Sequence, residues 1–525
     1  MPIPTEKARE ILQKHQAGHI ENLFAQSSAR YVLYEVGESE DNFPSFDSAL
    51  TDKVTLSAYS ILAAGVSLAE ANLTGEVIAA MEEAAALLIN VHAPYAETEL
   101  TSSFHVLIAS MAFHASGQYS RAFVYIRKAE LLTPLARIVA SLIRKRPADA
   151  ILEANQYLLA DLSAMTDSWS LCDHAVTLSI SRSTSLVLEY FATGNQQYLA
   201  SSIENLNIAM ELASDYDSPS HWWIARLLRL MISGNGQASL WHALPPYFPG
   251  DATLLSRYIR LHAYASKSVT ELWRSQLDAI PITLGQGRTG AVVNMRTSSG
   301  KTRVAELVIL QTLHENPGAK ILYLAPFRSL ALEIEQTLCQ IFDRCGFLVS
   351  HLYGGFRLSS ADRQIAKDST ITIATPEKIR AILRSSPELL NDVRLIIIDE
   401  GHLIGADKRY VKNELFIDHL RVLARSSACR ILLLSAVLPN PDELAVWLTG
   451  DVGNVARSGW KPSSERFGIL RWQGSSVRID WKGDLSRANA KGSMTINLRG
   501  GKIGGPFSLR IKMKRLRHLQ YDYVQ

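Results

Sequence analysis

Cysteine is scarce in this chain, and the few present show no metal-binding spacing. The 525 residues include four cysteines, none of them in a C-x-x-C pair, and no histidine cluster has the spacing of zinc ligands. These absences exclude a zinc finger or a similar structural zinc site. We expect free thiols in a reducing compartment.

Long apolar runs and a signal-like N-terminus are also missing. The longest apolar stretches are interrupted by Glu, Ser or Arg, so none reaches the roughly 20 residues of a membrane span. Residues 1–6 lack the basic and then apolar pattern of a signal peptide. The sequence predicts a cytoplasmic protein with no membrane contact.

A strong excess of one charge is absent as well. The formal net charge is +3, and 20% of the residues are charged against 47% hydrophobic, which is ordinary for a soluble globular protein. The net charge therefore neither favours nor excludes a polyanionic partner.

Residues 1–265 form the first of three regions that differ in their apolar pattern. Apolar residues recur at spacings of three and four, as in residues 77–88, and short breaks contain Gly117 and Gly194. The breaks resemble those between the helix pairs of tetratricopeptide repeats, although a packed bundle fits equally well. We predict an all-helical region, either a repeat-like platform for a protein partner or a bundle.

Residues 266–452 alternate short apolar runs with helical stretches. The runs lie at 291–294, 321–324, 370–374, 395–398 and 431–434. Near-continuous apolar runs suit strands that are buried on both faces, and helices between them imply a parallel sheet. The predicted fold class is therefore an α/β domain with a parallel sheet, preceded by the all-α region and followed by a short β-rich extension.

Residues 453–525 form the third region. Polar and apolar residues alternate in 466–472 and 477–481 around Gly474, which predicts a β-hairpin. The tail between Lys491 and Arg517 is rich in Lys and Arg. Two interpretations stay open for this tail: contact with a nucleic-acid backbone, or a solvated linker.

A phosphate-binding loop is predicted between a strand and a helix of the middle region. The strand at 292–294 runs into Met295-Arg296-Thr297-Ser298-Ser299-Gly300-Lys301-Thr302. In this context the backbone N–H groups of Thr297, Ser298, Ser299 and Gly300 cradle phosphates at the start of the helix. Lys301 is expected to neutralise the β and γ phosphates, and the Thr302 hydroxyl to ligate Mg²⁺. Met295 stands where a glycine normally opens this loop.

An acidic pair follows the strand at 395–398. Asp399 and Glu400 stand at its C-terminal end, where parallel sheets bind their ligands. We expect Asp399 to hold Mg²⁺, and Glu400 to orient and deprotonate the attacking water. Phosphoryl transfer requires mainly positioning and charge neutralisation, which these residues and Lys301 supply.

The order of these motifs resembles the first RecA-like domain of superfamily 2 helicases of the DEAD/DEAH-box type. The resemblance covers about residues 273–449 and implies an ATP-dependent helicase with ATP, Mg²⁺ and nucleic acid, DNA or RNA, as its ligands. It implies that Gln276 reads adenine. It also implies that the nucleic-acid backbone is held by Pro326, Arg328, Gly354, Gly355, Thr375 and Pro376.

Two further residues are expected to couple hydrolysis to movement. Ser435 begins Ser435-Ala436-Val437, which is similar to the Ser-Ala-Thr motif of the family, and His402 follows the acidic pair. Val437 replaces the threonine of that motif and removes one hydroxyl. Arg296 stands where the family often has proline.

A second RecA-like domain, which would supply arginine fingers, is not apparent after Thr449. The sequence thus suggests a chain that stops before its second motor domain, as a fragment, a frameshifted product or half of a split system. Because such fingers contribute on the order of 10³–10⁵ in rate, we expect the isolated chain to bind ATP weakly and hydrolyse it slowly.

Two classes of function remain open. The ordered motifs favour an ATP-dependent nucleic-acid helicase or translocase module. Val437 and the apparent lack of a second motor favour a scaffold that uses nucleotide as a switch without turnover. A P-loop ATPase of another kind fits poorly, since it does not need the backbone-gripping motifs between Lys301 and Asp399.

Overall fold

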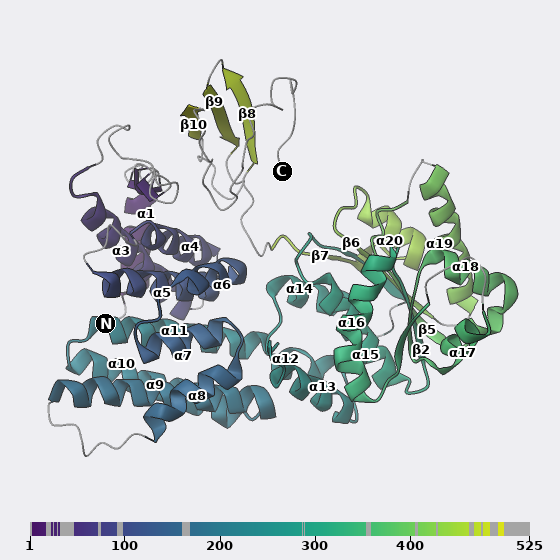
Figure 1. Cartoon of the computed structure of the whole chain (residues 1–525), viewed down its shortest axis with the longest axis horizontal. Coiled ribbons are helices and arrows are strands. Elements are labelled where there is room, and N and C mark those ends of the chain that lie inside the picture. The colour runs from purple at the N-terminus through teal and green to yellow at the C-terminus, as the bar shows by residue number, and fades with distance from the viewer. Residues whose placement is uncertain are drawn as a thin grey trace. The chain divides into compact units, whose positions relative to one another are not determined.

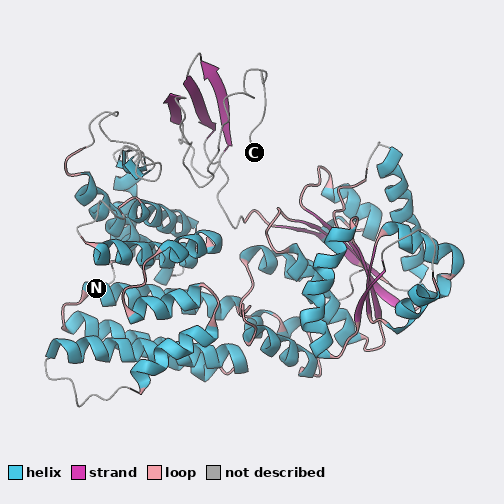
Figure 2. Cartoon of the chain, viewed as in Figure 1, coloured by secondary structure: helices cyan, strands magenta, loops and turns pink. Residues whose placement is uncertain are grey.

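A computed structural model describes most of the chain (Figures 1 and 2). The described residues are 3–16, 23–24, 26–28, 30–31, 47–71, 75–91, 98–159, 168–285, 287, 289–352, 359–404, 408–426, 429–460, 467–473, 476–482 and 492–497. Contacts within the chain define two compact units, one of residues 1–144, 210–231 and 462–525 and the other of residues 145–209 and 232–461. We describe each unit by itself.

The first unit begins with helices that pack in chain order, α3 on α4, α4 on α5 and α5 on α6. Their apolar residues recur along one face, as Val54, Ala58 and Ile61 do in α3, and this face is buried. The helices are α1 (Thr5–Gln16), α3 (Leu50–Glu70), α4 (Gly75–Ile89), α5 (Glu99–Ala115), α6 (Tyr119–Lys128) and α7 (Pro134–Ile143).

A three-stranded antiparallel sheet comes from the C-terminal part of the chain. It consists of β8 (Phe467–Gln473), β9 (Ser476–Lys482) and β10 (Gly492–Asn497), in the order β10-β9-β8. The alternating pattern predicted the pairing of β8 with β9, but it did not predict β10. Arg466, Gly474 and the basic tail from residue 498 onward lie outside the described residues, and so does Lys491.

The second unit also begins with helices. The helical prediction for the N-terminal half is confirmed, and the break at Gly194, whose φ is +78°, separates α9 from α10. None of the described helices has both the length and the apolar character needed to cross a membrane. The helices between residues 147 and 263 are α8 (Pro147–Leu158), α9 (Ser168–Thr193), α10 (Gln196–Asp215), α11 (Pro219–Ala238), α12 (Leu240–Ala243), η3 (Pro245–Tyr247) and α13 (Thr253–Ala263). The end of α10 and the first part of α11, at residues 210–231, belong to the first unit.

A parallel sheet with the strand order β3-β4-β2-β5-β6-β1-β7 forms the centre of this unit. All five predicted strands are present, because their apolar runs are buried on both faces. Short edge strands without such runs, β3 and β7, were not predicted. The strands are β1 (Gly290–Asn294), β2 (Lys320–Leu324), β3 (Val349–Leu352), β4 (Ile371–Ala374), β5 (Val393–Ile398), β6 (Arg430–Ser435) and β7 (Val455–Arg457).

Helices cover both faces of the sheet, as Figure 2 shows. Neighbouring strand residues alternate between two apolar cores: Val293 packs with α13, α14, α15 and α16, and Val292 packs with α18, α19 and α20. The remaining elements are α14 (Arg274–Thr283), α15 (Lys301–Glu315), α16 (Arg328–Cys345), α17 (Ser360–Asp368), α18 (Pro376–Ser385), η4 (Pro387–Leu390), α19 (Lys408–Ser426), α20 (Pro441–Thr449) and η5 (Val452–Asn454).

Residues on both sides of the predicted range 266–452 pack against this sheet. Leu240, Phe248 and Tyr258, which precede it, belong to the same apolar core as β1 and α15. At the other end β7 pairs with β1. The bounds 266–452 stay a prediction from the sequence pattern.

Candidate nucleotide and nucleic-acid site

The strand order brings the predicted motifs to one edge of the sheet. β1, β6 and β5 are consecutive neighbours, and the phosphate loop follows β1, Ser435 ends β6, and Asp399 follows β5. Because the strands are parallel, their carboxyl ends lie at the same edge. Residues that are about a hundred positions apart in sequence therefore converge.

The phosphate loop folds tightly into the start of α15. Gly300 is the N-cap of α15 with φ +85°, and Ser298 also has a positive φ of +62°, which is uncommon for a residue other than glycine. The Ser299 hydroxyl donates to the Arg296 carbonyl at 2.6 Å. Thr297, Ser298 and Thr302 are exposed, so this part of the loop is open to a ligand.

Met295 explains how the loop tolerates the loss of its usual first glycine. Its side chain is 1% exposed and belongs to the core beneath the sheet. The Met295 N–H donates to the Ser435 carbonyl at 3.2 Å, which continues the pairing of β1 with β6. The bulky side chain thus packs away from the loop, and the phosphate-binding backbone is left free of it.

Gln276 supports the phosphate loop from behind. Its Oε1 accepts the Trp273 N–H at 2.8 Å, and its Nε2 donates to the Gly300 carbonyl at 3.4 Å. A Cβ atom at Gly300 would lie 2.1 Å from this Nε2 and would displace the Gln276 amide, while the φ of +85° itself favours glycine at this position. These contacts give Gln276 a positioning role, and its predicted contact with adenine stays a prediction.

Lys301 lies between the loop and the acidic pair. Its Nζ donates to the carbonyls of Met295 and Arg296 at 3.2 and 3.3 Å. Burial lowers the pKa of Lys301, while the carboxylates of Glu400 and Asp399 act in the opposite direction. The ammonium therefore stands in the field of the acidic pair, where a phosphate and a divalent cation would have to bind together.

Asp399 is held rigidly at the end of β5. The Tyr323 hydroxyl donates to its Oδ2 and the Glu400 N–H to its Oδ1, both at 2.8 Å. Burial raises the pKa of Asp399, and these hydrogen bonds and Lys301 only partly oppose it. A cation bound beside this buried carboxylate would stabilise its ionised form.

The oxygen donors fit Mg²⁺. Asp399 offers a fixed carboxylate, and Thr302 offers an exposed hydroxyl. Among the described residues no cluster of three His, Cys, Asp or Glu could hold a metal ion alone. This donor set matches the usual coordination of Mg²⁺ in phosphoryl-transfer sites, where one or two protein oxygens bind the ion together with phosphates and water.

Glu400 and Gly401 adopt a strained turn. Glu400 has φ +51°, a conformation that costs energy for a residue with a side chain and often marks functional sites. A Cβ atom at Gly401 would lie 2.6 Å from the Leu433 side chain. The turn therefore lies close against β6, where the Gly401 N–H also donates to the Leu434 carbonyl at 2.8 Å.

The two predicted coupling residues meet beside Glu400. His402 Nδ1 lies 3.2 Å from Glu400 Oε2 and 3.4 Å from the hydroxyl of the fully buried Ser435. Val437 is 71% exposed, and its N–H donates to the Ser435 hydroxyl at 3.3 Å. The substitution of Val437 for threonine thus removes a hydroxyl at the surface and leaves the contact between β6 and the acidic turn in place.

The predicted nucleic-acid contacts follow two adjacent strands, β2 and β4. Pro326 and the exposed Arg328 lie at the start of α16, and Thr375 is the N-cap of α18 with Pro376 in its first turn. These four residues share the sheet edge with the nucleotide motifs. Gly354 and Gly355 lie outside the described residues.

A buried polar network behind the phosphate loop was not predicted. Glu306 Oε1 accepts from the Tyr258 hydroxyl at 2.8 Å and from Arg303 Nη1 at 2.6 Å, and lies 2.9 Å from His262 Nε2. Tyr258 and His262 belong to α13, and Arg303 and Glu306 to α15. This tetrad ties α13 to the helix that carries Lys301. Its only signal in the sequence is a set of polar side chains on otherwise apolar helix faces.

Comparison with known proteins agrees with this geometry. Residues 273–444 match the model of the DEAD/DEAH box helicase family. The chain is 34% identical over 483 residues to the Hachiman protein HamB of Bacillus cereus, a match that covers 91% of this chain and 42% of that protein. It is also 34% identical over 204 residues to the ATP-dependent DNA helicase Hel308 of Pyrococcus abyssi, covering 39% and 27% of the two chains.

Among solved structures, the chain is similar to the helicase MrfA bound to DNA and AMPPNP. The two are 26% identical with a TM-score of 0.34, and the match covers 39% of this chain and 29% of that one. The chain thus spans less than half the length of the curated relatives it matches.

Proposed function

Since residues 273–444 carry a DEAD/DEAH box helicase domain, we propose that this chain binds and hydrolyses ATP and couples hydrolysis to the binding and movement of nucleic acid. The observation that carries the proposal is the convergence of Lys301 with Asp399 and Glu400 at the ends of β1 and β5. A cation on a phosphate loop beside a carboxylate pair is what transfer of a γ-phosphate to water requires.

Each residue of this group has a distinct role. The backbone of residues 297–300 and Lys301 bind and orient the phosphates, and Glu400 takes the proton from the attacking water. Thr302 and Asp399 would hold Mg²⁺, which, when bound, neutralises the charge that develops on the phosphates. The contacts of His402 with both Glu400 and Ser435 offer a path by which hydrolysis moves β6.

The nucleic-acid partner is proposed for the same edge of the sheet. Arg328 supplies an exposed cation at the start of α16, and Thr375 and Pro376 present the N-terminus of α18. Helix N-termini and arginine bind phosphate oxygens without reading bases. This surface does not discriminate DNA from RNA.

The match to Hachiman protein HamB includes the helical residues as well as the helicase domain. We therefore propose that the chain acts in the same system as HamB, and that its helical region serves there to bind a protein partner.

A nucleotide switch without turnover is the second candidate. The exposed Val437 favours it, since the hydroxyl that the family motif carries at this position is missing. In this alternative ATP binding changes the conformation around Ser435 without hydrolysis.

The rate of ATP hydrolysis with and without nucleic acid distinguishes these candidates. We expect the full chain to hydrolyse ATP slowly alone and faster with single-stranded DNA or RNA, because phosphates bound near Arg328 and Thr375 order the adjacent site. Measurement of phosphate release at saturating MgATP checks this. If the chain bound ATP but nucleic acid left its rate of ATP hydrolysis unchanged, the nucleotide switch would be favoured.

A further inference from the structure

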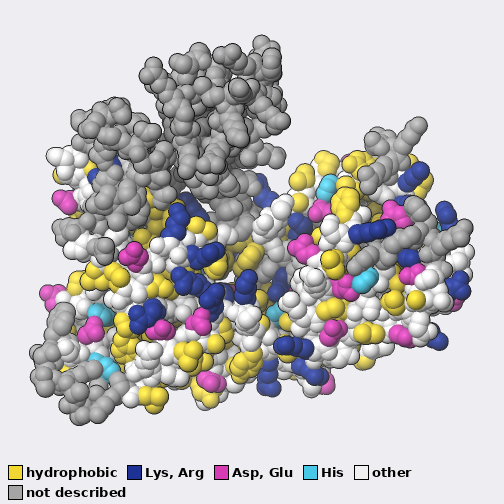
Figure 3. Space-filling view, viewed as in Figure 1, with side chains coloured by type: hydrophobic (Ala, Val, Ile, Leu, Met, Phe, Trp, Pro, Cys, Tyr) yellow, Lys and Arg dark blue, Asp and Glu magenta, His cyan; other side chains and the backbone are white. Residues whose placement is uncertain are grey.

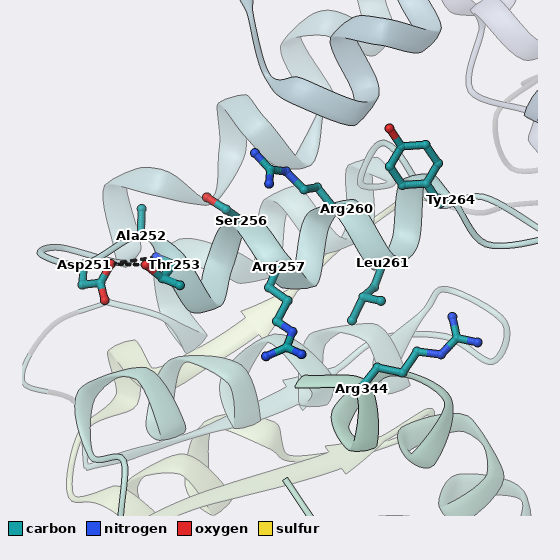
Figure 4. A pocket seen from close by; sticks show the side chains of 9 residues that line it. All are labelled: Asp251, Ala252, Thr253, Ser256, Arg257, Arg260, Leu261, Tyr264 and Arg344. Carbon is teal, nitrogen blue, oxygen red and sulfur yellow. Dashed lines mark hydrogen bonds between the residues drawn. The ribbon is translucent and has the colours of Figure 1, made fainter. Parts of the chain in front are cut away.

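A cleft of about 540 Å³ lies on the far side of α13 from the phosphate loop. Arg257 and Arg260 line it from α13, Tyr264 from the residue that caps this helix, Arg344 from the end of α16, and Asp251 stands at one end. Figure 4 shows Arg257 and Arg260 extending from α13 in different directions, Tyr264 at the end of this helix, and Arg344 extending from the end of α16. We call this feature the arginine cleft.

The positive charges of the three arginines in the arginine cleft are not paired with acidic side chains of the described residues. Arg257, Arg260 and Arg344 are exposed, and within the described part of the chain none of their guanidinium groups has a hydrogen-bond or ion-pair partner. Asp251, the one acid in the lining, accepts from the N–H and the hydroxyl of Thr253 at 2.9 and 2.6 Å. Figure 3 shows Lys and Arg side chains gathered where Figure 1 draws α13. Three neighbouring cations favour an anionic ligand.

The helix that carries two of these arginines is firmly fixed. The inner face of α13 holds Tyr258 and His262, which bind Glu306 of α15. The outer face is exposed at Arg257, Arg260 and Tyr264, which follow one another at spacings of three and four residues. A ligand therefore meets groups that a fixed helix carries and does not have to order a loop.

The arginine cleft is distant from the predicted nucleic-acid motifs. Arg328 begins α16 and Arg344 lies near its end, which at 1.5 Å per residue separates their backbones by about 24 Å. A phosphate at Arg344 is therefore not the phosphate that Arg328 contacts. At a rise of about 3.4 Å per nucleotide, a strand that reached both would span roughly seven nucleotides.

We propose that the arginine cleft binds the backbone of a nucleic-acid strand at a second site, outside the helicase motifs. The proposal rests on the proposed function, which makes nucleic acid the partner of this domain. The three arginines contact phosphates, and Tyr264, which is 73% exposed, stacks on a base. The backbones of Arg257 and Tyr264 lie about 10 Å apart along the helix axis, which corresponds to about three stacked nucleotides.

The exposed tyrosine favours nucleic acid over an acidic peptide as the ligand. An acidic peptide would use only the charges, whereas a strand offers a charged backbone and flat bases to the same surface. Grooves that combine cations with an exposed aromatic ring are typical of single-strand binding without sequence preference.

The salt dependence of strand binding tests the proposal directly. Affinity of the full chain for a labelled single strand of about 30 nucleotides is measured by fluorescence anisotropy across a salt series. Each phosphate contact with a single strand contributes about 0.7 to the slope of log K against log salt. Loss of three contacts should lower the slope by about 2 and weaken binding about 100-fold at 0.1 M salt. The test variant carries Arg257→Gln, Arg260→Gln and Arg344→Gln.

The control variant removes three exposed cations elsewhere on the domain and should behave like the wild type. It carries Arg363→Gln, Lys367→Gln and Arg384→Gln. A single Tyr264→Ser variant guards against misfolding of the triple variant. It should bind about 5- to 100-fold more weakly because a stack is lost, with an unchanged salt slope because no charge is lost.

Three other results would contradict the proposal. Wild-type binding with the same slope in the triple variant would overturn the second site and leave the helicase proposal intact. No binding of any strand by the wild type would overturn both. Loss of poly-glutamate binding in the triple variant, with strand binding retained, would show that the cleft serves an acidic protein partner.

Discussion

Replacing Glu400 with glutamine is expected to slow ATP hydrolysis by about 10²–10⁴-fold, the usual contribution of a general base. Glutamine keeps the size of the side chain but cannot take a proton from water. The positive φ at this position costs both residues about the same, so the fold and MgATP binding should be retained. Single-turnover hydrolysis of labelled ATP, with protein in excess, measures the effect even if turnover is slow.

The matched control for this prediction is Glu388→Gln. Glu388 is an exposed carboxylate of the same domain, and its loss should leave the hydrolysis rate unchanged. If Glu400→Gln hydrolysed ATP as fast as the wild type, Glu400 would not be the base, and the proposed enzymatic role would lose its main support.

Replacing Glu306 with alanine should cost about 3–5 kcal/mol of unfolding free energy, the loss expected when one partner of a buried ion pair is removed. Glu306 is 2% exposed and is the acceptor that Arg303 and Tyr258 share. Without it the Arg303 charge stays between α13 and α15 uncompensated. Chemical denaturation measures the loss, and Glu315→Ala, at an exposed position of the same helix, should stay within about 0.5 kcal/mol of the wild type.

The pH dependence of this contribution has a definite sign. Burial alone would raise the pKa of Glu306, but the charge of Arg303 and the hydrogen bonds from His262 and Tyr258 lower it below its usual value. Ionised Glu306 therefore stabilises the fold above its unfolded pKa, and this stabilisation is lost as pH falls through the lower folded pKa. A stability difference between wild type and Glu306→Gln that grew with acidification would contradict this account.

The central strands were predictable because their chemistry is local. The run from Leu395 to Ile398 is apolar throughout and is buried on both faces of the sheet. In contrast, β3 includes Ser350 and His351 between its apolar ends, and β7 is three residues long. Such edge strands depend on the neighbour they pair with, which no local pattern specifies.

The same distinction applies to the site. The roles proposed for Lys301, Asp399 and Glu400 come from the sequence, because their residue types and their order match those of a phosphate site. The residues that hold this site in place could not be predicted, because they are distant in sequence. Tyr323 of the adjacent β2 binds Asp399, and Tyr258 binds Glu306 from α13, a helix that lies before the predicted start of the domain. Met295 shows the converse, since it departs from the motif in sequence while its side chain is buried in the core and not exposed in the loop.

Binding of MgATP by the full chain tests the central claim most directly. Calorimetric titration of the wild type and of Lys301→Ala, with the exposed Lys367→Ala as control, compares the loop lysine with an ordinary surface lysine. Truncation of one partner of a hydrogen-bonded charge pair costs on the order of 2–5 kcal/mol of binding free energy, so Lys301→Ala should bind at least about 30-fold more weakly while Lys367→Ala matches the wild type. Equal affinity for all three proteins would show that the loop after β1 is not a nucleotide site.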